Sequence, residues 1–445
     1  MINRFGPIAR NSFLNLVGFT IPLLAGLVSV PIITRELGPA RFGLLSLAFA
    51  ILEYSTLFDL GLGAATTREV SASLAKSDEN VSVLISGSIV SQMLLGSVGA
   101  LILMAIAPLL VDHVFVIPPD IRNEAVSVFR ILALMTPPTL LLLSLRGVLE
   151  AAQRFDLSNA VRVPSSVMTF VIPAVAASAG YSLPAIVAML LIARVTIVVV
   201  MFFVVHKTIP SLKWKLKLDW PALKPLFLFG GWMSVSNVVS PLLVYLDRFM
   251  LGSLIGLTAV GYYTAPFDGV MRLLILPASL MGAVFPSVSA MSAIGDHTSV
   301  KRIFSKAVAK TLLITSGPAL ILAFAGPLLL RLWLGPVFAE QGATAIRILA
   351  VGVFINALAH VPSGVITAMG RPDVVARFHI FELFIHVPAA WLLITHYGVA
   401  GAAAAWTFRV TVDAALLFFT ALRMLKDFPN TIPPDALVDP VPILP

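Results

Sequence analysis

The sequence predicts an all-α polytopic membrane protein with about 12 transmembrane helices arranged in two six-helix lobes. Three observations predict this fold class: a very apolar composition, a succession of apolar runs, and an internal repeat. The 445 residues are 58% hydrophobic and 12% charged, with a mean hydropathy of +0.98. Soluble domains carry roughly 25% charged residues, so this chain cannot cover itself with polar surface in water.

The apolar runs are about 20 residues long, which is the length needed to cross a hydrocarbon core of roughly 30 Å. Helices are expected because lipid offers no hydrogen-bond partner to the backbone, and a barrel would show shorter alternating segments. The predicted spans are 12–34, 42–66, 83–110, 126–150, 160–180, 183–206, 226–252, 258–284, 304–330, 344–369, 376–397 and 399–422.

The distribution of basic residues predicts the orientation of these spans. Nineteen Lys and Arg residues fall on the side of the N-terminus and six on the other, and all ten lysines are in the first group. Because cytoplasmic loops are enriched in basic residues, both termini are expected in the cytoplasm. The formal net charge of +8 therefore indicates membrane orientation rather than binding to nucleic acid.

Several classes of site are excluded or disfavoured by composition. The chain has no cysteine, which rules out disulfides and thiolate sites. Its seven histidines show no HExxH spacing, and those inside spans are expected to be ordinary polar contacts. The first apolar run is too long for a signal peptide and is expected to be a retained helix.

An internal repeat divides the chain. "RILALMTPPTLLLLSLRGVLEAAQRFD" (130–156) aligns with "RILAVGVFINALAHVPSGVITAMGRPD" (347–373) at an offset of 217 without a gap. "LGPARFGLLSLAF" (37–49) aligns with "IGLTAVGYYTAPF" (255–267) at an offset of 218, and both keep Gly-x4-Gly. An even number of helices per copy gives both copies the same orientation, related by a pseudo-twofold axis along the membrane normal.

The predicted organisation follows from this repeat. Residues 1–206 and 222–426 form the two lobes, 207–221 is a basic cytoplasmic linker, and 427–445 is a disordered proline-rich tail. The linker is interpreted as a solvated loop that sets topology, with an anionic-lipid site as the alternative. Two such lobes enclose a V-shaped central cavity, which indicates transport by alternating access, although a duplicated channel stays possible at this point.

Charges inside the spans are the candidate functional residues, because each costs about 2.5–3.5 kcal/mol at the bilayer centre. Asp268–Arg272 and Arg409–Asp413 have i,i+4 spacing, so each is either a structural pair or part of a site. The charged residues in the spans are Glu53, Asp59, Arg146, Glu150, Arg194, Asp247, Arg248, Asp268, Arg272, Glu382, Arg409 and Asp413.

The adjacent residues Asp247 and Arg248 need different partners, because neighbours on a helix point about 100° apart. This favours a role in a cavity over a simple structural pair. Arg146, Glu150 and Arg194 lie near the ends of spans, where their side chains can extend to the membrane interface. Arg35 is either an interfacial anchor or a cavity residue, and Glu53 and Asp59 have no basic partner on their own helix.

Two segments resemble the polysaccharide transporter family of the multidrug/oligosaccharidyl-lipid/polysaccharide exporter superfamily. "PIITRELGPARFGLLSLAFAILEYSTLFDLGLGAATTRE" (31–69) has R-x-L-G-x4-G followed by D-x-G-x6-R. "YLDRFMLGSLIGLTAVGYYTAPF" (245–267) resembles the matching hairpin of the second lobe, with D-R-x3-G and V-G-Y-Y. The resemblance extends over nearly the whole chain, although each motif is degenerate.

This resemblance implies a flippase for undecaprenyl-diphosphate-linked oligosaccharides, such as O-antigen, exopolysaccharide or capsule repeat units. It also implies that the first, second, seventh and eighth helices line the cavity. The implied substrate-binding residues are Arg35, Arg248 and Arg272, and the implied cavity or ion-coupling acids are Glu53, Asp59, Asp247 and Asp268. No cofactor or metal is expected, apart from coupling to protons or sodium.

Two other functions compete with the flippase. A cation-coupled multidrug antiporter of the same superfamily would need an acidic cavity, and four acids with three arginines do not decide between them. A membrane enzyme such as a polymerase would need a catalytic motif, usually on a large external loop, and every external loop here is short. The resemblance further implies the bacterial inner membrane, lipid contacts, and a polysaccharide polymerase and chain-length regulator as partners.

Overall fold

The structure is a computed structural model of the full chain and describes residues 7–75, 81–209 and 242–427. Every regular element in these ranges is helical, and two of the helices bend at a glycine with non-helical backbone angles. The α-helices are α1 (Pro7–Ser55), α2 (Leu62–Ala75), α3 (Val81–Leu109), α4 (Arg122–Ala133), α5 (Thr136–Ala151), α6 (Phe155–Ser178), α7 (Leu183–Thr208), α9 (Leu257–Met271), α10 (Ile275–Ala293), α11 (His297–Leu334), α12 (Pro336–Ala368) and α13 (Pro372–Asp427).

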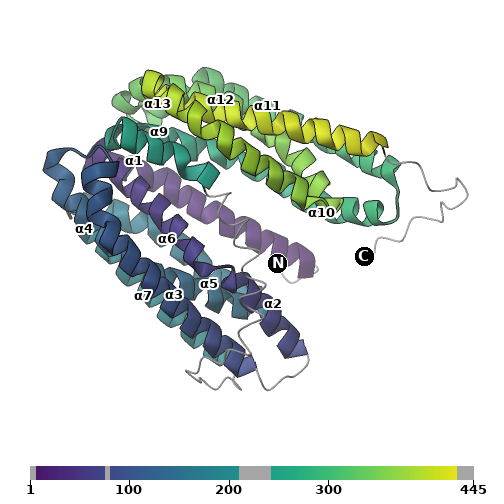
Figure 1. The fold of residues 1–445 in the computed structure, drawn as a ribbon, viewed down its shortest axis with the longest axis horizontal. Helices are drawn as coiled ribbons and strands as arrows, with labels where there is room; N and C mark the ends of the chain where they lie inside the picture. The colour runs from purple at the N-terminus through teal and green to yellow at the C-terminus, as the bar shows by residue number, and fades with distance from the viewer. Residues whose placement is uncertain (1–6, 76–80, 210–241, 428–445) are drawn as a thin grey trace, which may run out of the picture. The chain divides into compact units, whose positions relative to one another are not determined.

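Short turns complete some of these helices. A π-turn η3 (Leu110–Val114) extends α3, and residues 242–254 form a further helix before α9. Three 3-10 turns, η2 (Thr56–Asp59), η4 (Pro119–Ile121) and η5 (Arg272–Leu274), lie between or at the ends of longer helices. The colours of Figure 1 follow this order along the chain.

Nine helical segments of the described part are long and apolar enough to cross a membrane. Two of them each contain two predicted spans: α1 bends at Gly38 (φ 74°) and α13 bends at Gly398 (φ 54°). The predicted span 226–252 lies partly outside the described residues. With these differences counted, the long helices agree with the predicted spans, and the all-α polytopic fold class is confirmed.

One predicted span ends earlier than expected. The span 42–66 was predicted as continuous, but the helix ends at Ser55. The chain then passes through η2 to Leu60 and Gly61, which both have positive φ. A new helix, α2, begins at Leu62. Sequence periodicity did not reveal this break, because Leu60 is apolar and a glycine such as Gly61 is also frequent inside membrane helices.

The chain forms two compact units, residues 1–264 and 265–445, with the boundary inside α9. In the first unit α1 packs against α6, and α5 packs against α2, α3 and α7. An apolar cluster that includes Leu62, Ile85 and Val148 fills the space between them. The linker 207–221 and the tail 427–445 lie mainly outside the described residues, and the predicted lobe boundaries stay a prediction.

The second unit is built mainly from α10, α11, α12 and α13. Helix α12 packs along both α11 and α13, and α10 packs against α11 and α12. Its apolar core includes Val300, Val365 and Leu417, and the ring of Phe267 meets that of Trp406 edge-on at 5.5 Å. The units are therefore each held by their own buried surface.

The two copies of the repeat end a helix in the same way. Arg154 is paired with Asp156 (Nε–Oδ1 3.0 Å) and Arg371 with Asp373 (2.9 Å). The preceding residue has positive φ in both copies, and the arginine N–H donates to the carbonyl five residues earlier at 2.8 Å and 3.1 Å. Equivalent positions with equivalent geometry support the predicted duplication.

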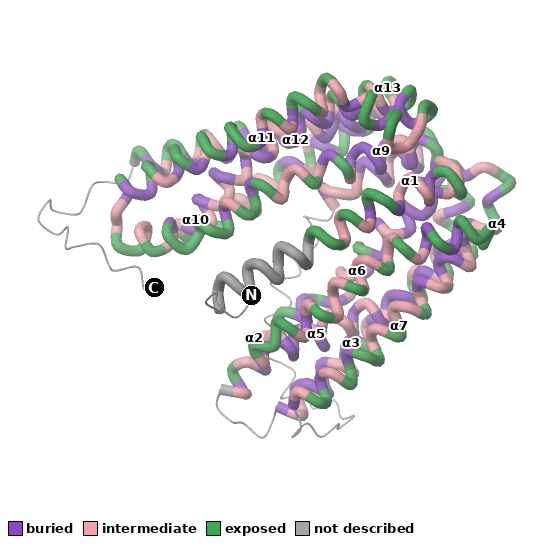
Figure 2. The backbone as a smooth tube through the Cα atoms, turned by 180° about the vertical axis from the view of Figure 1, so that it is seen from behind, coloured by how far each residue is buried: buried purple, intermediate pink, exposed green. Residues whose placement is uncertain are grey.

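Large apolar side chains are exposed along the long helices, as a lipid-facing surface requires. Phe324, Leu313 and Leu332 on α11 are 81%, 77% and 76% exposed. Figure 2 shows buried and exposed residues recurring along the same helices, as expected when one side faces protein. Most residues of these helices are apolar, so packing rather than hydropathy decides which of them are buried.

Candidate functional site

The first unit contains a cavity of about 230 Å³ that is lined by charged and hydroxyl side chains from four helical segments. Glu53 comes from α1, Arg146 from α5, Arg162 from α6 and Arg194 from α7. Each of these residues lies inside a candidate membrane span. The cost of a charge in lipid favours such grouping, because one shared cavity gives these charges polar neighbours and access to water.

The cavity holds more positive than negative charge. Arg146 Nε donates to Glu150 Oε1 at 2.6 Å, one helical turn away. Arg194 on α7 and Glu53 on α1 both line the cavity, so that one guanidinium and one carboxyl group share this space. Arg162 adds a third guanidinium, and Ser165 and Ser166 add hydroxyl groups. This arrangement can bind an anion, because guanidinium groups match phosphate and carboxylate bidentately.

Asp59 belongs to a separate, buried polar network. Its Oδ1 accepts hydrogen bonds from the Gln92 side-chain amide and from the Gly63 N–H, the latter at 3.0 Å. Asp59 is 7% exposed and Gln92 is fully buried. Nearby, the hydroxyl groups of Thr66 and Ser88 are hydrogen-bonded at 2.6 Å, and Ser88 is also hydrogen-bonded to Ser144 on α5 at 2.9 Å. Asp59 is not among the residues that line the arginine cavity.

Asp247 and Arg248 are both buried and take different partners, as their adjacent positions predicted. Asp247 Oδ2 accepts a hydrogen bond from the Tyr263 hydroxyl at 3.1 Å. The Arg248 guanidinium lies 5.3 Å from the centre of the Tyr245 ring, at the distance of a cation–π contact. Both contacts lie within the first unit, and the role of this pair in a transport cavity stays a prediction.

The remaining predicted site residues are more exposed. Arg35 is exposed on α1, three residues before the bend at Gly38. Asp268 is half-buried near the end of α9, and Arg272 is exposed where that helix gives way to η5. Their assignment to substrate binding or ion coupling stays a prediction as well.

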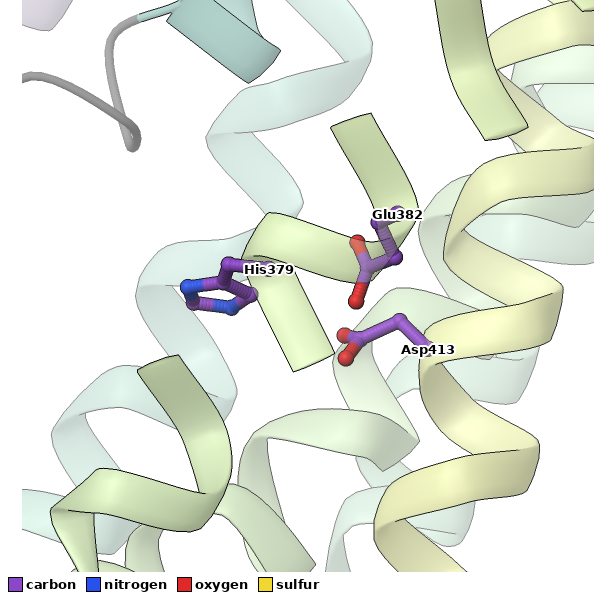
Figure 3. Close-up of side chains that lie close together, drawn as sticks. All are labelled: His379, Glu382 and Asp413. Carbon is purple, nitrogen blue, oxygen red and sulfur yellow. The ribbon is translucent and has the colours of Figure 1, made fainter. Parts of the chain in front are cut away.

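A second charged cluster lies in the second unit, where the two arms of α13 meet (Figure 3). Glu382 Oε2 accepts from Arg409 Nη1 at 3.1 Å, across 27 residues of chain. The ion pair with Glu382 differs from the intrahelical Arg409–Asp413 pair that spacing suggested. The ligand atoms of His379, Glu382 and Asp413 lie within 4.8 Å of one another, so these three described residues could together hold a metal ion.

Sequence reasoning missed the grouping of both clusters. It interpreted Arg146 and Arg194 as residues near span ends and did not single out Arg162, whereas the structure brings all three to one cavity. It also gave no role to Gln92, a buried amide in an apolar helix. A glutamine in such a run is the one signal that could have identified the Asp59 network.

The fold is that of a membrane transporter. A solved multidrug resistance MATE family transporter in an inward-facing conformation has a TM-score of 0.79 at 15% identity, over 92% of this chain and 98% of that chain. A MOP superfamily transporter from Pyrococcus furiosus gives 0.66 at 16% identity, over 94% and 95%. At these identities the similarity establishes the two-lobe transporter fold alone.

The family follows from sequence comparison. The model for "Polysaccharide biosynthesis protein" matches residues 8–292, and the MatE model matches residues 233–392. A Shigella flexneri protein named as a candidate O-antigen transporter is 32% identical over 423 residues, which cover 95% of this chain and 100% of that protein. The uncharacterised membrane protein EpsK of Bacillus subtilis is 23% identical, over 78% of this chain and 69% of its own length.

This protein therefore belongs to the polysaccharide biosynthesis protein family, and the predicted resemblance is confirmed. It is a multi-pass membrane transporter of a polysaccharide-related family rather than an enzyme, as predicted.

Proposed function

We propose that this protein is a flippase that moves undecaprenyl-diphosphate-linked oligosaccharide repeat units from the cytoplasmic to the periplasmic leaflet. The 32% identity to the candidate O-antigen transporter supports a glycan substrate. The proposal includes the bacterial inner membrane as location, both termini in the cytoplasm, and transport by alternating access of the two lobes. A polysaccharide polymerase and a chain-length regulator are the proposed partners.

The single observation that carries the proposal is the cavity lined by Arg146, Arg162 and Arg194. A lipid-linked oligosaccharide has a diphosphate and often acidic sugars, and guanidinium groups bind both while staying charged. A cavity of about 230 Å³ is too small for a whole oligosaccharide. It would hold the diphosphate or one acidic sugar, while the polyprenyl chain stays in lipid.

The test is translocation of a lipid-linked oligosaccharide in proteoliposomes. Arg194→Gln removes a cavity cation, and Arg154→Gln, in an exposed ion pair of the same unit, is the matched control. Loss of one charged hydrogen-bond donor should slow translocation by roughly ten- to one-hundred-fold, because such bonds contribute roughly 1.5–3 kcal/mol. The control should transport at the rate of the wild type.

Arg248→Ala in the same assay separates two roles of the buried pair. Lost translocation with an unchanged thermal midpoint would assign Arg248 to transport, and retained translocation would make it structural. Wild-type vesicles that move no lipid-linked glycan but export cationic dyes would replace the flippase with the multidrug antiporter.

A further inference from the structure

The cluster on α13 has a geometry that the flippase proposal does not use. His379 and Glu382 lie on the arm of α13 before Gly398, and Arg409 and Asp413 lie on the arm after it. The Glu382–Arg409 ion pair holds these arms side by side. Figure 3 shows the carboxyl groups of Glu382 and Asp413 directed toward each other, with the His379 ring beside them.

The two carboxyl groups are buried and only partly satisfied. Glu382 is 1% exposed and Asp413 is 8% exposed. In the described part of the chain, no donor is hydrogen-bonded to Glu382 Oε1 or Asp413 Oδ1, although Glu382 Oε2 is bonded to Arg409. A buried polar atom without a partner costs free energy, and a charged one costs more, so these oxygens are expected to meet a ligand.

The charge of the cluster indicates that this ligand is a cation. Two carboxyl groups lie together in a candidate membrane span, and the single guanidinium of Arg409 can balance the charge of only one of them. Buried charges are normally paired or coordinate a metal ion. An anion or a neutral sugar would leave the excess charge in place.

The donor set narrows the class of cation. One imidazole nitrogen and two carboxylate oxygens, one from each residue, suit first-row transition metals, whereas calcium and magnesium prefer oxygen ligands alone. Zinc binds nitrogen and oxygen at about 2.0–2.2 Å in tetrahedral geometry, so its ligand atoms lie roughly 3.4 Å apart. The ligand atoms here lie within 4.8 Å of one another, so metal binding requires these side chains to move closer together. Arg409, bonded to the second oxygen of Glu382, would hold that ligand in orientation.

We propose that His379, Glu382 and Asp413 form a binding site for a divalent transition-metal ion such as zinc within the second unit. The site takes ligands from both arms of α13, the one before Gly398 and the one after it. Bound metal would therefore fix the arms against each other. This proposal is independent of the flippase function, since it concerns binding within one unit.

The experiment measures metal bound to the full-length purified protein, prepared without a polyhistidine tag and stripped with a chelator. The protein is dialysed against Zn²⁺ and analysed for metal content, and against Co²⁺ for its visible spectrum. We expect about one ion per chain, a Co²⁺ absorption spectrum typical of a site with low coordination number, and a higher thermal unfolding midpoint with metal than without it. His379→Ala, Glu382→Gln and Asp413→Asn should each lose this binding.

The control is His396→Ala, which removes an exposed histidine of the same helix and should bind like the wild type. Glu382→Gln and Asp413→Asn preserve side-chain shape, so their thermal midpoints without metal show whether the fold is intact. A folded wild-type protein that retains no metal would overturn the site and leave two carboxyl groups that share a proton. Equal metal content in the wild type and His379→Ala would also overturn it.

Discussion

Gly43 and Gly261 occupy the same position in the two sequence repeats, and each lies against the backbone of the other's segment. A Cβ atom at Gly43 would lie 1.9 Å from the Leu257 carbonyl oxygen, and one at Gly261 would lie 2.3 Å from the Pro39 carbonyl oxygen. The contact is reciprocal, as a local twofold relation requires. The second glycine of the Gly-x4-Gly pattern noted in the sequence therefore marks a contact between the two repeated segments within the first unit.

Replacement of these glycines tests the contact. Gly43→Ala and Gly261→Ala should each destabilise the protein by about 1–3 kcal/mol, because the backbone must move to admit a methyl group. Gly282→Ala is the control, since nothing lies within 4 Å of its added Cβ and alanine favours the helix by about 1 kcal/mol. Thermal unfolding in detergent measures all three. A stable Gly43→Ala would mean that the segments are further apart.

The buried ion pair of α13 should contribute far more than an exposed one. Arg409→Gln removes the cation that pairs with the buried Glu382, and breaking such a buried pair typically costs about 3–5 kcal/mol in proteins. Arg371→Gln removes an equally short but exposed pair and should cost less than about 1 kcal/mol. The comparison is made by thermal unfolding in the same detergent. Equal shifts for the two variants would contradict the burial of the α13 pair.

The Asp59–Gln92 contact predicts a coupled pair of substitutions. Gln92→Leu removes a donor from a buried carboxylate and should cost about 1–3 kcal/mol. Asp59→Leu in that background removes the orphaned acceptor, so the double variant should be more stable than the sum of the single losses predicts. A double-mutant cycle from thermal midpoints measures this coupling. Strict additivity would place the two side chains out of contact.

The start of α11 predicts a dependence of stability on pH. Asp296 caps this helix by accepting from the Ser299 N–H at 2.9 Å. The pKa of Asp296 is lowered, first by the Ser299 side chain, then by this backbone N–H, with a smaller effect of Arg302. A lowered folded-state pKa gives stability that is complete above the unfolded pKa, about 3.9, and is lost as pH falls through the folded value.

Asp296→Ala should therefore cost about 1 kcal/mol at neutral pH, as expected for loss of a helix cap. The difference from the wild type should shrink below about pH 4, where the aspartate becomes protonated. Asp296→Asn keeps an oxygen acceptor and should show a smaller loss that changes little with pH. Unfolding at several pH values measures the three proteins. A difference in the free energy of unfolding between Asp296→Ala and the wild type that increases as pH falls would contradict this capping role.

Hydropathy and repeats predicted much of the fold, because membrane insertion depends on local composition summed over each run. The break at Leu60 escaped prediction because a left-handed leucine has no distinctive sequence signal. The charged residues inside the spans were correctly singled out as costly, yet their grouping was not predicted. Spacing suggested an Arg409–Asp413 pair within one helix, and the structure pairs Arg409 with Glu382 on the other arm.

Local sequence was enough to predict a duplicated, multi-pass membrane protein that resembles the polysaccharide transporter family, since length, hydropathy and motifs are properties of local segments. Which charges meet depends on tertiary packing. Arg146, Arg162 and Arg194 come from three helices, and Glu382 and Asp413 come from the two arms of α13. Their contacts depend on how helix surfaces pack and where Gly398 bends the chain, and neither is encoded in the spacing along one helix.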